Sequence, residues 1–102
     1  MTIIWANAFY ICKSLTSITL PEGVTSIESG TFDGCSSLAS ITIPEGVTEI
    51  DSAFWRCDQL KDVYYAGTKE EKEAISIDEN NDPLLNATWH YNSTGPEVLP
   101  DV

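Results

Sequence analysis

Residues 27–50 read IESGTFDGCSSLASITIPEGVTEI, and close relatives of this stretch lie directly before and after it. Moved back by about 23 residues, the stretch places apolar residues on apolar residues, and Pro44 falls on Pro21. Moved forward, the match continues from Ile50 with one residue deleted before the next phenylalanine. So many coincidences at one spacing indicate an internal repeat.

One part of each repeat has the alternation of a β-strand. In residues 38–43, Ile41 and Ile43 alternate with the polar residues Ser40 and Thr42, so the predicted strand is apolar on one side. The same run recurs at residues 15–20 and 60–65. Stacked copies would pair these strands into a parallel sheet, with the isoleucines inside and the hydroxyl side chains outside.

The rest of each repeat supplies the turns that close a coil. Pro44 ends the strand because it has no N–H for the ladder, and Gly46 favours a turn. Residues 47–50 are typical of a second short strand. The Phe-x-x-Cys segment, here Phe32 to Cys35, is predicted to form one tight helical turn with both side chains pointing inward.

The pattern Ile-Pro-Glu-Gly-Val-Thr-x-Ile followed by Phe-x-x-Cys-x-x-Leu resembles the BspA-type leucine-rich repeat of bacterial surface proteins. The resemblance covers residues 1–65, and residues 62–91 are similar to the segment that often follows the last repeat. It implies a leucine-rich-repeat solenoid, β-rich with short parallel strands and short helical turns, about 23 residues per coil. It also implies an extracellular or cell-surface location, a role in adhesion or protein recognition, no catalytic residues and no cofactor.

The period stops after Tyr65, and a different segment follows. Thr68 and Glu71 have the spacing of a capping box, which predicts a short helix over about 69–75. The remaining expectations are a return of Ile77 to the core, a polar loop at 78–82, a turn at Asp82–Pro83 and a final strand at 88–92. We therefore divide the chain into repeat coils (1–65, the first incomplete), a C-terminal capping segment (66–92) and a linker or disordered tail (93–102).

The charge excludes several kinds of partner. The chain has 16 Asp plus Glu and five Lys plus Arg, a formal net charge of −11. Such a surface repels phosphate backbones and anionic membrane surfaces, so we expect no nucleic-acid partner. No apolar run approaches the roughly 18–20 residues of a membrane span, so no membrane insertion is expected. Met1 leads directly into patterned sequence, without the pattern of a signal peptide.

Three cysteines occupy the same place in consecutive repeats: Cys12, Cys35 and Cys57. Stacked coils lie about 4.8 Å apart, which would permit a disulfide by distance, but stacked side chains point in parallel. We therefore favour a buried ladder of free thiols. A metal site is disfavoured, because no second Cys or His follows any of them at ligand spacing.

The polar residues do not form a convincing catalytic or metal site. The single histidine, His90, lies on a predicted strand, and no nucleophile motif accompanies it. Asp78, Asn80 and Asp82 have the spacing at which a calcium loop begins. Pro83 then replaces the required glycine, so a solvated acidic loop is the better interpretation. The sequence predicts no enzyme, no metal and no cofactor.

Two surfaces remain as candidate binding sites. The outer face of the predicted sheet is the usual binding surface of curved solenoids, although a solvated sheet without a partner is the alternative. Its outward residues are Ser17, Thr19, Ser40, Thr42, Asp62 and Tyr64. The second candidate is the first coil, where polar positions of the later coils have become apolar. The residues concerned are Ile3, Trp5, Tyr10 and Ile11.

We expect a second copy of the chain to cover the first coil, which makes a homo-oligomer through the N-terminal coil the expected assembly. The alternative is cover by further repeats upstream. The predicted function is a non-enzymatic protein-recognition or adhesion module that binds a protein partner or a host surface component. The alternative function is a structural spacer or self-assembly module with no external ligand.

Overall fold

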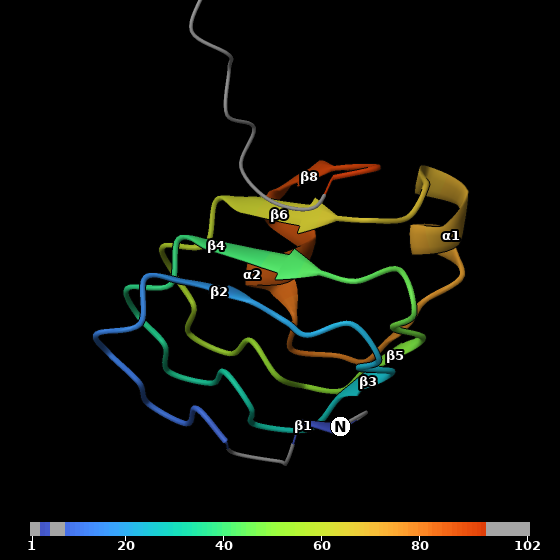
Figure 1. Ribbon diagram of the computed structural model, residues 1–102. Helices are drawn as coiled ribbons and strands as arrows, with labels where there is room; N and C mark the ends of the chain where they lie inside the picture. Colours follow the sequence, from blue (N-terminus) through green and yellow to red (C-terminus); the bar gives the residue numbers. More distant parts are fainter. Residues whose placement is uncertain (1–2, 5–7, 94–102) are drawn as a thin grey trace, which may run out of the picture.

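Each repeat contributes one strand to each of two parallel sheets (Figure 1). The computed structural model describes residues 3–4 and 8–93. One sheet has the order β1-β3-β5-β7, formed by Ile3–Ile4, Ser26–Ile27, Glu49–Ile50 and Ser76–Ile77. The other has the order β2-β4-β6-β8, formed by Ser17–Thr19, Ser40–Ile43, Asp62–Tyr65 and Thr88–His90. The helices are α1 (Lys69–Glu73) and α2 (Asp82–Asn86).

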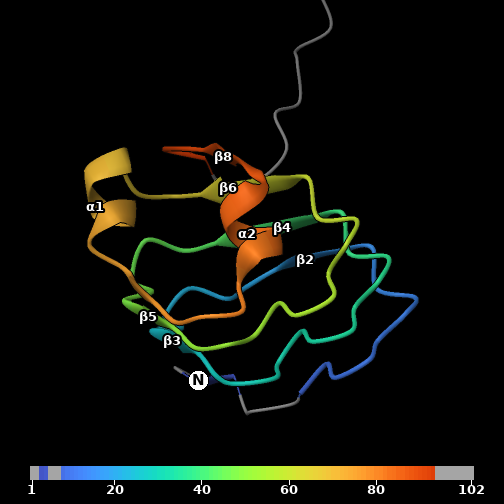
Figure 2. The same cartoon turned by 180° about the vertical axis from the view of Figure 1, so that it is seen from behind.

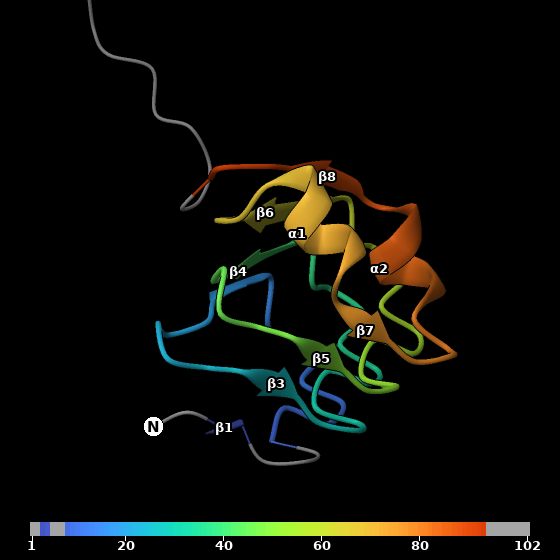
Figure 3. The same cartoon turned by 90° about the vertical axis from the view of Figure 1, so that its right-hand side faces the viewer.

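The register places equivalent residues of successive coils on one another. Ile41 of β4 pairs with Ile18 of β2 on one side and with Val63 of β6 on the other. In the β1-β3-β5-β7 sheet, the narrower of the two because each strand has only two residues, Ile27 pairs with Ile50 in the same way. Figure 3 shows β1, β3, β5 and β7 as successive steps of the stack. The repeat predicted from sequence therefore corresponds to one coil of a solenoid.

A ladder of phenylalanine rings runs through the interior beside the aliphatic residues. The rings of Phe9 and Phe32 are stacked with centroids 5.4 Å apart, and those of Phe32 and Phe54 are 5.3 Å apart. Phe32, Phe54, Leu38 and Ile41 are fully buried. Each coil thus adds one aromatic and several aliphatic side chains to one continuous core.

The Phe-x-x-Cys segment closes each coil as a hydrogen-bonded turn. The Cys35 N–H donates to the carbonyl of Phe32 at 3.1 Å, and Cys57 and Phe54 repeat this bond at 3.1 Å. Both phenylalanines and both cysteines point inward and are buried, as the sequence predicts. The segment forms turns rather than a complete helical turn.

The helix expected after the third coil is confirmed. Thr68 caps α1: its hydroxyl accepts from the N–H of Glu71 at 3.1 Å, and the Glu71 carboxylate accepts from the N–H of Thr68 at 2.9 Å. In Figure 3 both helices lie at the end of the stack occupied by β7 and β8, away from β1. They therefore cover the C-terminal end of the solenoid.

Residues 66–92 do more than cover this end, because they extend both sheets. β7 pairs with β5, with Ile77 opposite Ile50, and β8 pairs with β6, with Trp89 opposite Val63. Figure 2 shows α2 beneath β8, and α2 lies between β7 and β8 in the chain. The segment therefore forms an irregular fourth coil with α1 inserted before β7.

The expected turn at Asp82–Pro83 is wrong, because α2 begins there. The residue before a proline avoids the helical region as a rule. A proline is nevertheless tolerated in the first helical turn, where its missing N–H removes no helical bond. The helix places Leu84 in the core, where it is fully buried.

Asn81, just before α2, provides hydrogen bonds that the next coil would otherwise supply. In the second coil, the Phe32 N–H donates to the carbonyl of Ala53 in the third. In the third coil, the N–H groups of Ala53 and Phe54 donate to Asn81 Oδ1 at 3.1 and 3.2 Å. Asn81 Nδ2 donates to the carbonyls of Asp51 and Asp78. One buried amide thus accepts two backbone N–H groups at the end of the third coil.

Candidate functional site

The outer face of the β2-β4-β6-β8 sheet carries two rows of polar side chains across the strands. Ser17, Ser40, Asp62 and Thr88 form one row, and Thr19, Thr42, Tyr64 and His90 form the other. The six residues predicted from sequence therefore lie together on one face. His90 and Thr88 extend this face on β8.

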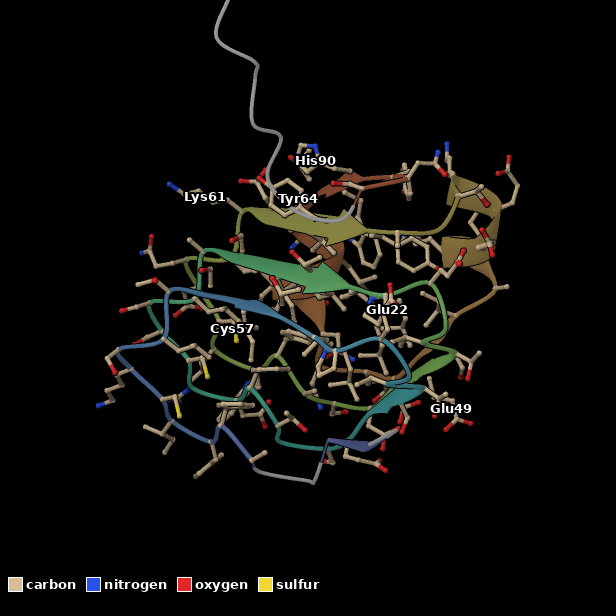
Figure 4. The ribbon with its side chains drawn as sticks, in the orientation of Figure 1. Glu22, Glu49, Cys57, Lys61, Tyr64 and His90 are labelled. Atoms are coloured by element: carbon tan, nitrogen blue, oxygen red, sulfur yellow. The ribbon has the colours of Figure 1, made fainter. Side chains whose placement is uncertain are left out.

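Asp62, Tyr64 and His90 form a connected cluster on this face. His90 Nε2 lies 2.9 Å from Asp62 Oδ1, and the His90 and Tyr64 rings are stacked with centroids 4.7 Å apart. Figure 4 shows Tyr64 and His90 side by side at the β6–β8 end of the sheet. The side chains of His90 and Asp62 are 42% and 39% exposed, so a partner can reach them. The cluster offers a partner an aromatic surface, a carboxylate and an imidazole in fixed positions.

Exposure differs along the same face. Thr19 is exposed, whereas Thr42 is only 7% exposed although its register position faces outward. A hollow of about 330 Å³ lies where the strands end, lined among others by Thr19, Thr42, Pro44 and Glu22. The face is therefore uneven, with the aromatic cluster at one end and a hollow beside β2 and β4.

The residues predicted to cover the first coil divide into two groups. Tyr10 and Ile11 are exposed, by 55% and 46%. Ile3 belongs to β1 by its backbone, and its side chain lies outside the described residues, as does Trp5. The predicted self-interface remains a proposal.

Tyr10 and Ile11 line a groove together with residues of the second and third coils. The groove has a volume of about 390 Å³ and lies at the turns that connect the two sheets. Each coil contributes three equivalent positions: Tyr10, Ile11 and Lys13; Asp33, Gly34 and Ser36; Trp55, Arg56 and Asp58. Large side chains of the first and third coils therefore flank small ones of the second.

Two contacts fix the wall formed by the third coil. The backbone N–H of Trp55 donates to Asp33 Oδ1 at 2.9 Å. The guanidinium of Arg56 lies 4.4 Å from the centre of the Trp55 ring, a cation–π contact. Trp55 is nevertheless 51% exposed, so its ring remains accessible from the groove.

The backbone at this groove is unusual. Ile11, Gly34 and Arg56 occupy equivalent positions and all have positive φ, at 55°, 77° and 64°. Only glycine adopts this conformation without steric cost, and a β-branched residue there is a true outlier. Ile11 and Arg56, which lie on the groove walls, therefore have strained backbone conformations.

Like charges meet on the narrower sheet. A hydrogen bond with Asp51, burial, and the charges of Asp51 and Glu49 raise the pKa of Glu28 above its usual value. Figure 4 shows Glu49 at the edge of the molecule, away from the Tyr64–His90 cluster. Glu28, Glu49 and Asp51 therefore form an acidic group that belongs to neither candidate surface.

The three cysteines are free thiols, as the sequence predicts. The Cys35 thiol donates to the carbonyl of Phe9 at 3.1 Å, and the Cys57 thiol donates to that of Phe32 at 3.0 Å. Burial raises the pKa of the Cys57 thiol to about 12 and also raises the pKa of Cys35. These thiols stay protonated at neutral pH and link neighbouring coils.

Metal ligands do not converge in the described ranges, 3–4 and 8–93, which hold no group of three His, Cys, Asp or Glu side chains suited to an ion. The side chains of Asp78, Asn80 and Asp82, weighed above as the start of a calcium loop, are exposed. Among the helices that the structure describes, none is long and apolar enough to cross a membrane.

Sequence reasoning missed three members of the candidate surfaces: His90, Trp55 and Arg56. His90 was weighed only for catalysis, although its predicted strand would follow the third-coil strand. Trp55 and Arg56 align with Tyr10 and Ile11 in the repeat, and this alignment carried the missing signal. Reading the positions across all three coils would have placed these four residues along one edge.

Comparisons with known proteins agree with this architecture. The family model described as the BspA type leucine rich repeat region matches residues 1–80. A solved structure of a leucine-rich cell surface protein from Faecalibacterium prausnitzii A2-165 is similar, with 39% sequence identity and a TM-score of 0.72. The match covers 74% of this chain and 20% of that protein, so the chain spans about one fifth of that neighbour. No curated protein matches the chain.

The repeat motif, the parallel stacking of its copies and the family match lead to one assignment. The chain is a β-rich leucine-rich-repeat solenoid and belongs to the BspA-type leucine-rich repeat family.

Proposed function

We propose that the chain is a non-enzymatic recognition module of a cell-surface protein, with the outer face of the β2-β4-β6-β8 sheet as its contact surface. The Asp62–Tyr64–His90 cluster is the observation that carries this proposal. Tyrosine is enriched among residues that dominate binding energies at protein interfaces, and here its ring is held in place by a stacked neighbour. The cell-surface neighbour supports the location.

The side chains of the cluster are held in place before a partner binds, which favours a recognition surface over a sheet face that contacts only water. The imidazole of His90 is oriented by Asp62, and both side chains belong to paired strands of the sheet. Little conformational freedom remains to be lost when a partner binds, which is the usual cost of ordering surface side chains. The proposal therefore predicts that adhesion depends on the cluster.

The test measures binding of the chain to immobilised collagen, laminin and mucin by surface plasmon resonance. Tyr64→Glu and Thr19→Glu should weaken binding to the recognised component about tenfold or more, because Tyr64 supplies the aromatic contact. Ser29→Glu is the matched control, since Ser29 is exposed and lies outside the sheet face. Equal binding by the variants and the control would contradict the proposal, as would the absence of binding to all three components.

Self-assembly is the second candidate function, and the partial exposure of the apolar residues of the first coil favours it. Phe9, Leu15 and Ile18 are only partly buried, whereas the equivalent Phe32, Leu38 and Ile41 are fully buried. In the described part of the chain, β1 and β2 are also the edge strands of their sheets. A half-covered core beside open strand edges invites pairing with another copy.

Light scattering of the wild type and of Trp5→Asp tests this second candidate. Self-assembly predicts a dimer or larger species that dissociates in the variant, because a charge would enter the apolar contact. Ser29→Glu again serves as the control and should leave the mass unchanged. A wild-type monomer at high concentration would contradict self-assembly.

A further inference from the structure

The groove at the turns of the three coils is separate from the sheet face and has an unusual composition. The described residues include four large apolar side chains that are exposed, and three of them, Tyr10, Ile11 and Trp55, line this groove. Scattered single apolar residues on a surface need no explanation, but a cluster in a hollow does. The cluster combines a tyrosine, a tryptophan and a neighbouring arginine, the residues most enriched in binding hot spots.

The walls and the floor of the groove follow from the repeat. The first and third coils are two coil spacings apart, roughly 10 Å. Asp33, Gly34 and Ser36 of the second coil, which have smaller side chains than Tyr10 and Trp55, lie between them. A Cβ atom on Gly34 would approach Ile11 Cγ1 to 3.1 Å, so the Ile11 side chain packs closely against the Gly34 backbone. A hollow of about 390 Å³ between walls two coil spacings apart has room for one extended chain.

Strain at the walls argues that the side chains are there for a reason other than stability. Glycine satisfies the positive φ in the second coil, whereas Ile11 and Arg56 adopt it at a steric cost. Both side chains are exposed, so their packing does not offset this cost fully. Backbone conformations that lower stability tend to be kept where they serve function, so their place on the groove walls favours a role in binding.

Charge at the groove differs from the rest of the molecule. The chain has a net charge of −11 and five Lys plus Arg, of which Lys13 and Arg56 line this groove. Asp33 and Asp58 also line the groove, so its formal charges balance, and the Asp33 carboxylate accepts the N–H of Trp55. The Arg56 guanidinium lies over the Trp55 ring, and its N–H groups can donate to a carboxylate of a partner.

We propose that this groove binds an extended peptide segment of a protein partner that carries a proline or aromatic ring next to an acidic residue. The ring lies between the side chains of Tyr10 and Trp55, and the carboxylate pairs with Arg56 and Lys13. Aromatic-lined grooves take extended, ring-bearing peptides in this way elsewhere in proteins. The inference rests on the proposed recognition function for the class of ligand, but it names a different surface.

A phage-displayed library of random peptides provides the probe. Peptides of about ten residues exceed the length needed to cross the groove at roughly 3.3 Å per residue. Selection on the wild-type chain, followed by removal of phage that bind Tyr10→Ala/Trp55→Ala, isolates ligands of the groove. Enriched sequences should share a proline or aromatic residue beside Asp or Glu, and synthetic copies should bind the wild type.

Single variants then test each part of the groove with a synthetic copy of the enriched peptide. Trp55→Ala should weaken binding at least tenfold, and Arg56→Asn should weaken it and reduce its dependence on salt. Asn tolerates positive φ, so Arg56→Asn removes the charge without adding strain. Tyr64→Ala, on the sheet face, is the control and should leave peptide binding unchanged.

Ile11→Gly separates binding from a structural role. If the side chain serves the ligand, the variant binds the peptide more weakly and keeps or raises its midpoint of urea unfolding. A large loss of stability would overturn the proposal, because the side chain would then act in folding. Three other outcomes would also overturn the proposal. The selection could enrich no sequence, or it could enrich sequences that share no ring and acid. The wild type could also self-associate in a way that Trp55→Ala abolishes. Variants of the sheet face test the proposed function, and variants of the groove test peptide binding. Because the two sets change different surfaces, failure of one proposal can be told from failure of the other.

Discussion

Single residues link the coils of this solenoid through groups that serve two neighbours. The carbonyl of Phe32 accepts the N–H of Cys35 in its own coil and the thiol of Cys57 in the next. The ring of the same Phe32 stacks on Phe9 below and Phe54 above. The thiol is therefore a hydrogen-bond donor as well as a small apolar side chain, which position and composition alone did not reveal.

The buried thiol makes stability sensitive to alkaline pH. Burial raises the pKa of Cys57 from 9.0 to about 12, so between these values the unfolded chain loses a proton that the native chain keeps. The native contribution is complete below pH 9 and is lost as the pH rises toward 12. The free energy of unfolding should fall over this window by at most about 1.4 kcal/mol per pH unit from this group.

Urea unfolding at pH 8, 9 and 10 checks this expectation, with Cys57→Ala as the comparison. The variant lacks the titrating thiol and should lose less stability over the same range than the wild type does. Identical slopes for the two proteins would show that the Cys57 thiol does not titrate differently in the folded and unfolded chains.

At the scale of elements, the sequence predicted the regular coils, the first helix, the return of Ile77 to the core and the final strand, but not α2 or β7. The capping box of Thr68 and Glu71 is a local signal, and α1 follows it. β7 has only two residues, too few for a period, and depends on pairing with β5. His90 and Asp62 meet across 28 residues, a contact that no local pattern contains.

Asn81 joins α2 to the third coil, and its loss should be costly. Asn81→Ala would leave the buried N–H groups of Ala53 and Phe54 without their acceptor. The expected loss in the free energy of unfolding is about 2–4 kcal/mol, since each unsatisfied buried group costs about 1–3 kcal/mol. Urea denaturation measures it. Asn80→Gly is the matched control: Asn80 is exposed with φ 66°, so glycine there should cost little.

Gly67 sets the close approach of the chain between β6 and α1. A Cβ atom at this position would lie 2.7 Å from ring carbons of Tyr65, whose ring is itself buried. Gly67→Ala should therefore lower the free energy of unfolding by about 1–3 kcal/mol through overpacking. Gly46→Ala is the control, because a Cβ atom there would lie 3.8 Å from the Val24 carbonyl oxygen, an ordinary van der Waals distance. Equal thermal midpoints for the two variants would contradict this account.

At the scale of the whole molecule, stability depends on a residue's place in the stack. Each coil contacts only its neighbours, as in other repeat proteins. Phe32 lies between two rings and is fully buried, whereas Phe9 is partly buried and has one ring neighbour in the described residues. A phenylalanine at the same repeat position therefore contributes different amounts to the free energy of unfolding in different coils.

Phe32→Ala should cost about 3–5 kcal/mol of unfolding free energy, the usual range for a buried phenylalanine. Phe9→Ala should cost distinctly less, because part of that ring is already in contact with water. Urea denaturation of the two variants under one set of conditions makes the comparison. Similar losses would show that the first coil is covered in solution, by a second copy or otherwise.

The amide of Asn81 has a consequence for how such chains change in length. It satisfies backbone groups that recur in every coil, so its task does not depend on how many coils come before it. Whole repeats can be gained or lost by duplication or deletion while one terminal segment serves every version. Each added coil also brings a new set of turns beside the existing ones, so the edge of the array can lengthen without any change to the segment that follows the last coil.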